Sequence, residues 1–125
     1  MMIKPTETEL EILNILWQEG PSSVRIVNEK MNEQKEVGYT TTLKLMQLMT
    51  QKGLVKRDES KRTHIYSAAV KAKDLQQTMV SKLMNAVFSG SAGQLALSAL
   101  GNGKASKQEL DEIKALIEQL ENDAK

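Results

Sequence analysis

Three helical patterns of apolar residues follow one another in the first half of the chain. They lie at about residues 6–19, 24–31 and 39–53, with apolar side chains at spacings of three and four. Thr6 and Glu9 predict a capping box at the start of the first helix, because each side chain can accept a hydrogen bond from the other residue's backbone N–H. Turn residues separate the patterns, so the sequence predicts three short helices.

Two strand-like runs come directly after the third helical pattern. Residues 54–57 and 63–67 have the composition of strands, and the residues between them are charged, which predicts a hairpin with a basic tip. Three helices followed by a charged hairpin is the order of a winged helix-turn-helix, whose third helix enters the major groove of DNA. The sequence therefore predicts a mainly α fold with an N-terminal winged helix-turn-helix and a small β-hairpin wing.

Positive charge is confined to one part of the chain. Residues 40–66 hold six basic and two acidic side chains, a net charge of +4, whereas the net charge is −3 before them and 0 after them. Binding of phosphates requires only that the contacting face is basic. The pattern favours a surface that binds a polyanion, and the alternative is a solvated stretch with a chance cluster of charge.

The outward face of the third predicted helix is short, polar and cationic, as expected for a helix that enters the major groove. The predicted groove contacts on this face are Thr40, Thr41, Lys44 and Gln47. The predicted contacts to the phosphate backbone are Ser22, Arg25, Lys52, Arg57, Lys61 and Arg62. The spacing places Thr42 on the inward face of the same helix.

The chain contains no cysteine and a single histidine, His64. This composition excludes disulfides, thiolate zinc sites and multi-histidine clusters, so we predict no metal site and no cofactor. A catalytic His64 would need a positioned nucleophile, and an exposed or hairpin-packed histidine is the better interpretation. No apolar run reaches the length of a membrane-spanning helix. We therefore expect a cytoplasmic protein without enzymatic activity.

Residues 70–125 are helical in pattern and predict a three-helix dimerisation domain after a DNA-binding domain at residues 1–69. These helices carry more apolar surface than so small a unit encloses alone. A symmetric partner would cover the surplus and would suit a protein that reads two DNA half-sites. The predicted dimerisation residues are Leu75, Met79, Leu83, Val87, Leu97, Leu110, Ile113, Ile117 and Leu120. The alternative is a monomer whose C-terminal helices pack on the N-terminal domain.

Four segments together resemble one known family: residues 8–17, 39–55, 65–66 and 88–91. The last, Phe-Ser-Gly-Ser, lies outside the module that many winged-helix proteins share. The chain resembles the penicillinase-repressor family, which includes methicillin-resistance and copper-transport repressors. The resemblance implies a homodimeric repressor that binds a palindromic operator in double-stranded DNA. It also places Thr41, Thr42 and Lys44 on the recognition helix, and on this ground Thr42 is counted among the predicted DNA-binding residues of that helix.

The resemblance also has implications for the relief of repression. Copper-responsive relatives bind the metal through C-terminal cysteine motifs, and this chain has no cysteine. In antibiotic-resistance relatives, a membrane sensor metalloprotease triggers cleavage of an Asn-Phe bond, and the matching place here is Ser98-Ala99. The resemblance thus implies a sensor metalloprotease as a partner. Cleavage would uncouple the two half-site readers.

Two other classes of function stay open from the sequence. Winged helices also serve as protein–protein adaptors, although an adaptor has no need of a basic helix face. A small molecule at the dimer interface could instead gate a winged-helix regulator. The seven methionines could line such a pocket, although their spacing is typical of core residues.

Overall fold

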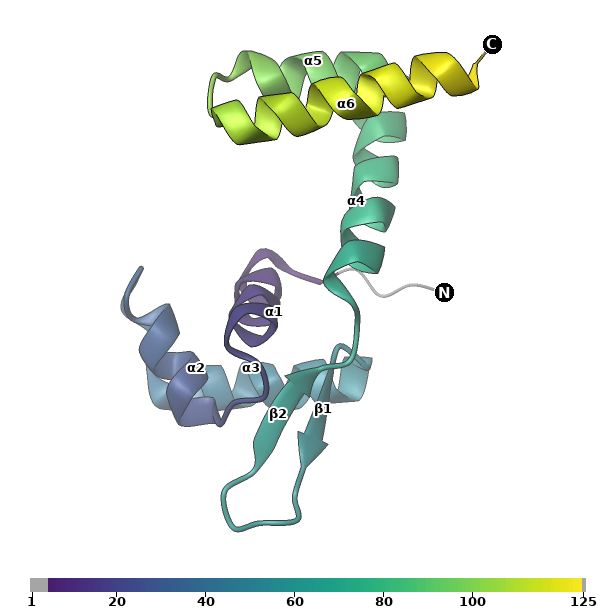
Figure 1. The fold of residues 1–125 in the computed structure, drawn as a ribbon. Helices are drawn as coiled ribbons and strands as arrows, with labels where there is room; N and C mark the ends of the chain where they lie inside the picture. The colour runs from purple at the N-terminus through teal and green to yellow at the C-terminus, as the bar shows by residue number, and fades with distance from the viewer. Residues whose placement is uncertain (1–4, 125) are drawn as a thin grey trace. The chain divides into compact units, whose positions relative to one another are not determined.

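The computed structural model describes residues 5–124 as six helices and one two-stranded antiparallel sheet (Figure 1). In chain order these are α1 (Glu7–Glu19), α2 (Val24–Met31), α3 (Tyr39–Lys52), β1 (Val55–Asp58), β2 (Ile65–Ala68), α4 (Ala72–Val87), α5 (Ala92–Gly101) and α6 (Lys107–Asp123). The predicted mainly α fold with a hairpin after the third helix is confirmed. None of the described helices is both long enough and apolar enough to cross a membrane.

The chain divides into two compact units inside α4, the first ending at Thr78 and the second beginning at Met79. The first turns of α4 belong to the first unit, and Leu75 on these turns is buried, with 6% of its surface exposed. Leu75 was predicted to contact a second copy of the chain, and its burial within its own chain corrects that prediction. The domain border predicted after residue 69 stays a prediction.

The start of α1 is fixed by the predicted capping box. The Thr6 hydroxyl accepts a hydrogen bond from the Glu9 N–H at 3.2 Å, and Glu9 Oε1 accepts one from the Thr6 N–H at 2.9 Å. The helix ends at Gly20, whose φ of 81° lies in a region that favours glycine. Its apolar face enters the core of the first unit, which consists of Ile12, Leu13, Leu16, Val24, Val27, Met31, Met46, Met49, Leu54, Val55, Tyr66 and Leu75.

The hairpin is joined to the helical core through backbone hydrogen bonds. Val55 pairs with Ala68 and Asp58 with Ile65, so each strand lies slightly later in the chain than the sequence predicts. The Ser22 N–H donates to the Tyr66 carbonyl at 2.9 Å, and the Tyr66 N–H donates to the Ser22 carbonyl at 2.8 Å. This bridge extends the pairing of β2 and fixes the hairpin beside the start of α2.

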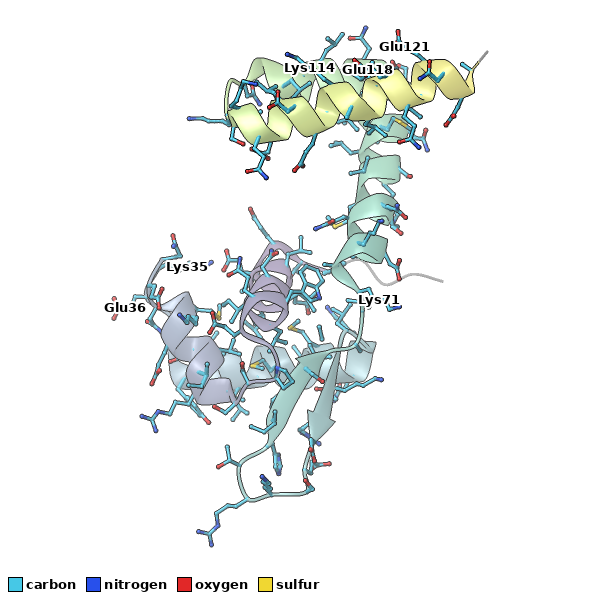
Figure 2. The ribbon with its side chains drawn as sticks, viewed as in Figure 1. Lys35, Glu36, Lys71, Lys114, Glu118 and Glu121 are labelled. Atoms are coloured by element: carbon cyan, nitrogen blue, oxygen red, sulfur yellow. The ribbon has the colours of Figure 1, made fainter. Side chains whose placement is uncertain are left out.

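The second unit consists of the remainder of α4 with α5 and α6. Ser106 and Glu109 form the predicted capping box at the start of α6. Figure 2 shows Lys114, Glu118 and Glu121 along one side of α6, which gives this helix a charged face. None of the described residues 79–124 is buried. The exposed large apolar residues here are Val80, Leu83, Val87, Leu97, Leu110, Leu116, Ile117 and Leu120.

Candidate nucleic-acid interface

One face of α3 is buried and the opposite face is open to solvent. Met46 and Met49 on the inward face are fully buried. Four predicted groove contacts lie on the exposed face: Thr40, Thr41, Lys44 and Gln47. Leu48, with 41% of its surface exposed, lies beside them. Because α3 contains no acidic side chain, nothing on this helix opposes the approach of a polyanion.

Thr42 is not on the exposed face, which corrects its assignment as a DNA contact. Its side chain is fully buried, and its hydroxyl accepts a hydrogen bond from Asn28 Nδ2 at 2.8 Å. The same hydroxyl lies 3.3 Å from the Gly38 carbonyl, to which it can donate. Thr42 therefore joins α3 to α2, as the inward position from its spacing predicted.

The turn before α3 is held by two asparagines that were not among the predicted functional residues. Asn28 Nδ2 and Asn32 Nδ2 donate to the Val37 carbonyl at 3.0 and 2.9 Å. Asn32 Oδ1 accepts from the Val37 N–H at 3.0 Å. With the Thr42 hydroxyl, these amides fix where α3 begins. Asparagine side chains commonly form hydrogen bonds with nearby backbone. The position of these two residues shortly before a turn was therefore the only signal in the sequence for this role.

The other end of α3 is held by an ion pair. Lys52 Nζ lies 2.8 Å from Glu9 Oε2, and only 2% of Glu9 is exposed. Burial alone would raise the pKa of Glu9, but hydrogen bonds from Lys52 and Thr6 outweigh it and hold this pKa below its ordinary value. Lys52 was predicted to contact the DNA backbone. Its ammonium is instead committed to a buried carboxylate within the fold.

Ser22 is a second predicted backbone contact that the structure corrects. Only 6% of its surface is exposed, and its hydroxyl donates to the Gly20 carbonyl at 2.8 Å. Its own N–H and carbonyl are occupied by Tyr66. Ser22 therefore connects the wing to the helices and has no group available for a phosphate.

The basic side chains of the wing differ in their exposure to solvent and in their ion pairs. Arg57 is 29% exposed, and its Nη2 lies 3.3 Å from Glu59 Oε1. Tyr66 and Glu59 both raise the pKa of Arg57, whose guanidinium is charged at neutral pH in any case. Lys61 and Arg62 lie in the exposed tip and form no ion pair within residues 5–124. The tip is consequently better suited to bind phosphate than Arg57, whose charge is already partly neutralised.

Arg25 lies on α2 and lines the same hollow as Tyr39 and Leu43 of α3. Its Nε lies 3.2 Å from Glu29 Oε1, but 81% of the arginine side chain is exposed. An exposed ion pair of this kind contributes little to stability, because solvent screens the attraction between its charges. Arg25 therefore stays available to an anion, and its contact with the DNA backbone stays a prediction. Within the described part of the chain, no cluster of three metal-ligating side chains is present.

The three helices, the hairpin and the exposed face of α3 define a winged helix-turn-helix protein. A family model described as penicillinase repressor matches residues 5–119. The chain belongs to the penicillinase repressor family and is a DNA-binding transcriptional regulator. The family resemblance found in the sequence is thereby confirmed. The family's described role is repression of transcription and not an enzymatic reaction.

Comparisons with individual proteins agree with this assignment. The chain is 18% identical over 117 residues to the penicillinase repressor of Bacillus licheniformis, a match that covers 94% of this chain and 91% of the relative. A MarR family protein from Bacillus stearothermophilus has a TM-score of 0.56 at 18% identity, over 98% of this chain and 76% of that one. The complex structure of hsRosR-S4 has a TM-score of 0.52 at 16% identity, covering 98% and 94%. At these identities, the structural matches show the fold.

The residues predicted to act in dimerisation and cleavage lie in accessible positions. Ser98 and Ala99 are both exposed within α5. Among the predicted dimerisation residues, Leu83, Val87, Leu97, Leu110, Ile117 and Leu120 are exposed, and Met79 and Ile113 are half-buried. These positions fit the predicted roles without testing them.

Proposed function

We propose that the chain represses transcription as a homodimer that binds a palindromic operator in double-stranded DNA. The observation that carries this proposal is the face of α3 formed by Thr40, Thr41, Lys44 and Gln47, which is exposed on a helix without acidic residues. The buried contacts of Thr42 and Lys52 hold the two ends of that helix. The proposed activity is binding, and no step of it requires a catalytic group.

The chemistry of this face assigns different roles to its residues. A lysine such as Lys44 can donate to guanine O6 and N7, and a glutamine such as Gln47 can bond to adenine N6 and N7. The methyl groups of Thr40 and Thr41 can contact thymine methyl groups. Lys61 and Arg62 on the wing and Arg25 on α2 supply positive charge for the phosphates, which set the position of the protein on the duplex.

Substitution of Lys44 tests the role of α3. Genomic fragments retained by the wild-type chain would supply the operator, and affinity for it would be compared with affinity for a shuffled duplex. We expect Lys44→Ala to lose about 1–3 kcal/mol on the operator and to discriminate less between the two duplexes. The matched control is Lys114→Ala, which removes an exposed lysine from α6. Equal affinity of wild type and Lys44→Ala for both duplexes would refute the role of α3.

The homodimer is supported by the surface of the second unit. None of its described residues is buried, although α4, α5 and α6 carry many large apolar side chains. Exposed apolar surface on this scale is typical of a protein interface. A two-fold dimer would also match the symmetry of a palindromic operator.

Cleavage at Ser98-Ala99 by a membrane sensor metalloprotease is the proposed route to relief of repression. Both residues are exposed, but they lie inside α5, so the helix must open locally before a protease can bind them. A cut would separate the two half-site readers and remove their avidity. Mass spectrometry after incubation with a cognate sensor protease would locate the cut, and an intact chain would contradict this route.

A further inference from the structure

A cleft of about 660 Å³ lies between the start of α2, the first turn of α3 and the residues that lead into β2. Its polar lining consists of Ser23, Arg25, Tyr39, Arg62, Thr63 and His64. The other lining residues are Val24, Ile26, Tyr66 and Leu43, of which Leu43 belongs to α3. The cleft therefore brings the residues that lead into β2 beside the starts of two helices that come earlier in the chain.

The charges that line the cleft have one sign. They come from two arginines, with a histidine beside them, and no carboxylate is among the lining residues. Arg62 has no ion pair within the described residues, and the pair of Arg25 with Glu29 is exposed to solvent. The hydroxyls of Tyr39 and Thr63 and the imidazole of His64 add hydrogen-bond donors. A concave surface of this composition favours an anion that accepts several hydrogen bonds.

The backbone supports the same preference. Both α2 and α3 begin at the cleft, where Ser23 is the N-cap of α2 and Tyr39 is the first residue of α3. The N-cap of α3 is Gly38, which has no side chain to accept a hydrogen bond from the first turn. The positive ends of two helix dipoles thus add to the charge of the arginines.

We propose that this cleft holds one phosphate of the operator backbone in each half-site. The inference rests on the proposed function, because Tyr39 and Leu43 line the cleft from the same helix that presents Lys44 and Gln47. When α3 lies in the major groove, the phosphates that border the groove lie beside this helix. His64 and Tyr39 then contact the same phosphate as Arg25 and Arg62.

The test replaces the phosphates of one half-site, one at a time, with uncharged methylphosphonates. The full chain is measured on a duplex that the wild type binds. We expect one position at which the replacement weakens wild-type binding about tenfold, which corresponds to the loss of one charge-assisted hydrogen bond. At that position the replacement should weaken the binding of Arg62→Ala and of His64→Ala less than it weakens wild-type binding, because one of the groups that hold the phosphate is already lost in each variant.

Lys61→Ala is the matched control. Lys61 is exposed in the same hairpin tip but does not line the cleft. This variant should bind with a salt slope lowered by about 1 at most and should keep the tenfold loss at the phosphate assigned to the cleft. If Arg62→Ala and His64→Ala keep the full wild-type loss at every position, the cleft holds no operator phosphate, although DNA binding itself stands. Failure of the wild type to bind any duplex in dilute buffer would instead refute the proposed function.

A free phosphate-bearing ligand shares the chemistry of the operator backbone, and a second measurement distinguishes them. Inorganic phosphate would be titrated into the full chain while the imidazole NMR signals of its single histidine are followed. Weak binding that operator duplex abolishes is expected for a backbone contact. Saturation at micromolar phosphate, without DNA, would overturn the assignment to the operator.

Discussion

The carboxylate of Glu9 is enclosed between the start of α1 and the end of α3. Its two oxygens accept hydrogen bonds from Lys52 Nζ at 2.8 Å and from the Thr6 N–H at 2.9 Å. These bonds favour the ionised form strongly enough to overcome burial, so the pKa of Glu9 is lower in the folded chain than its ordinary value of 4.5. One side chain thus caps α1 and also fixes the helix proposed to read DNA.

The lowered pKa of Glu9 makes the stability of the first unit depend on pH. The unfolded chain takes up a proton at Glu9 at a higher pH than the folded chain. The stability that Glu9 contributes is therefore complete above its ordinary pKa of 4.5 and is lost as the pH falls toward the folded value. We expect Glu9→Gln to lower the free energy of unfolding by about 1–3 kcal/mol at neutral pH, and by less in acid.

Unfolding in urea at a series of pH values measures this difference. The control is Glu7→Gln, because Glu7 lies in the same first turn of α1 but is exposed. A stability difference between wild type and Glu9→Gln that stays constant down to pH values well below 4.5 would contradict the lowered pKa.

At the scale of the element, α3 is held at its start by amide side chains from α2 and the following turn. Asn28 donates to both the Val37 carbonyl and the Thr42 hydroxyl. The Val37 carbonyl also has Asn32 as a donor, whereas the fully buried Thr42 hydroxyl depends on Asn28 for the hydrogen bond it accepts. A loss of Asn28 should therefore affect stability and the placement of α3 together.

We expect Asn28→Ala to cost about 1–3 kcal/mol in the free energy of unfolding, because it leaves a buried hydroxyl without its donor. Operator affinity should fall as well, since the first turn of α3 carries Thr40 and Thr41. Adding Thr42→Val should recover part of the stability, because the unpaired hydroxyl is then removed. Urea unfolding and operator binding would be measured for each variant, with the exposed Gln34→Ala as control. Additive losses from the two substitutions would show that Asn28 and Thr42 are not coupled.

The elements themselves could be predicted from the sequence because their signals are local. Thr6 and Glu9 are three residues apart, and periodicity alone placed Thr42 inside. The failures concern contacts between distant positions. Glu9 and Lys52 are separated by 43 residues, so the sequence around Lys52 does not indicate that its charge is paired with a carboxylate. Ser22 is likewise occupied by Tyr66 of the wing. A candidate binding residue can be read from a helix face, but its availability depends on the tertiary fold.

At the scale of the whole molecule, the proposed dimer depends on apolar side chains that the single chain leaves exposed. Ile117 on α6 is 50% exposed, whereas the charged side of the same helix carries Glu118 (Figure 2). A lysine at position 117 would bury an unpaired positive charge in the interface. Burial of an unpaired charge away from water has a high cost in free energy. The same substitution at 118 would leave the charge in solvent.

We therefore expect Ile117→Lys to be monomeric at concentrations where the wild type and Glu118→Lys are dimers, as measured by sedimentation equilibrium. Because Ile117 is not buried in its own chain, the variant should still fold and should bind a single half-site as the wild type does. Its affinity for the complete operator should fall about 100-fold or more, since two linked half-site readers gain that factor from avidity. A wild-type chain that sediments as a monomer would refute the dimer, whereas a dimeric Ile117→Lys would place the interface elsewhere on the molecule. Loss of half-site binding in the monomer would show instead that dimerisation is needed to form the DNA-reading surface itself.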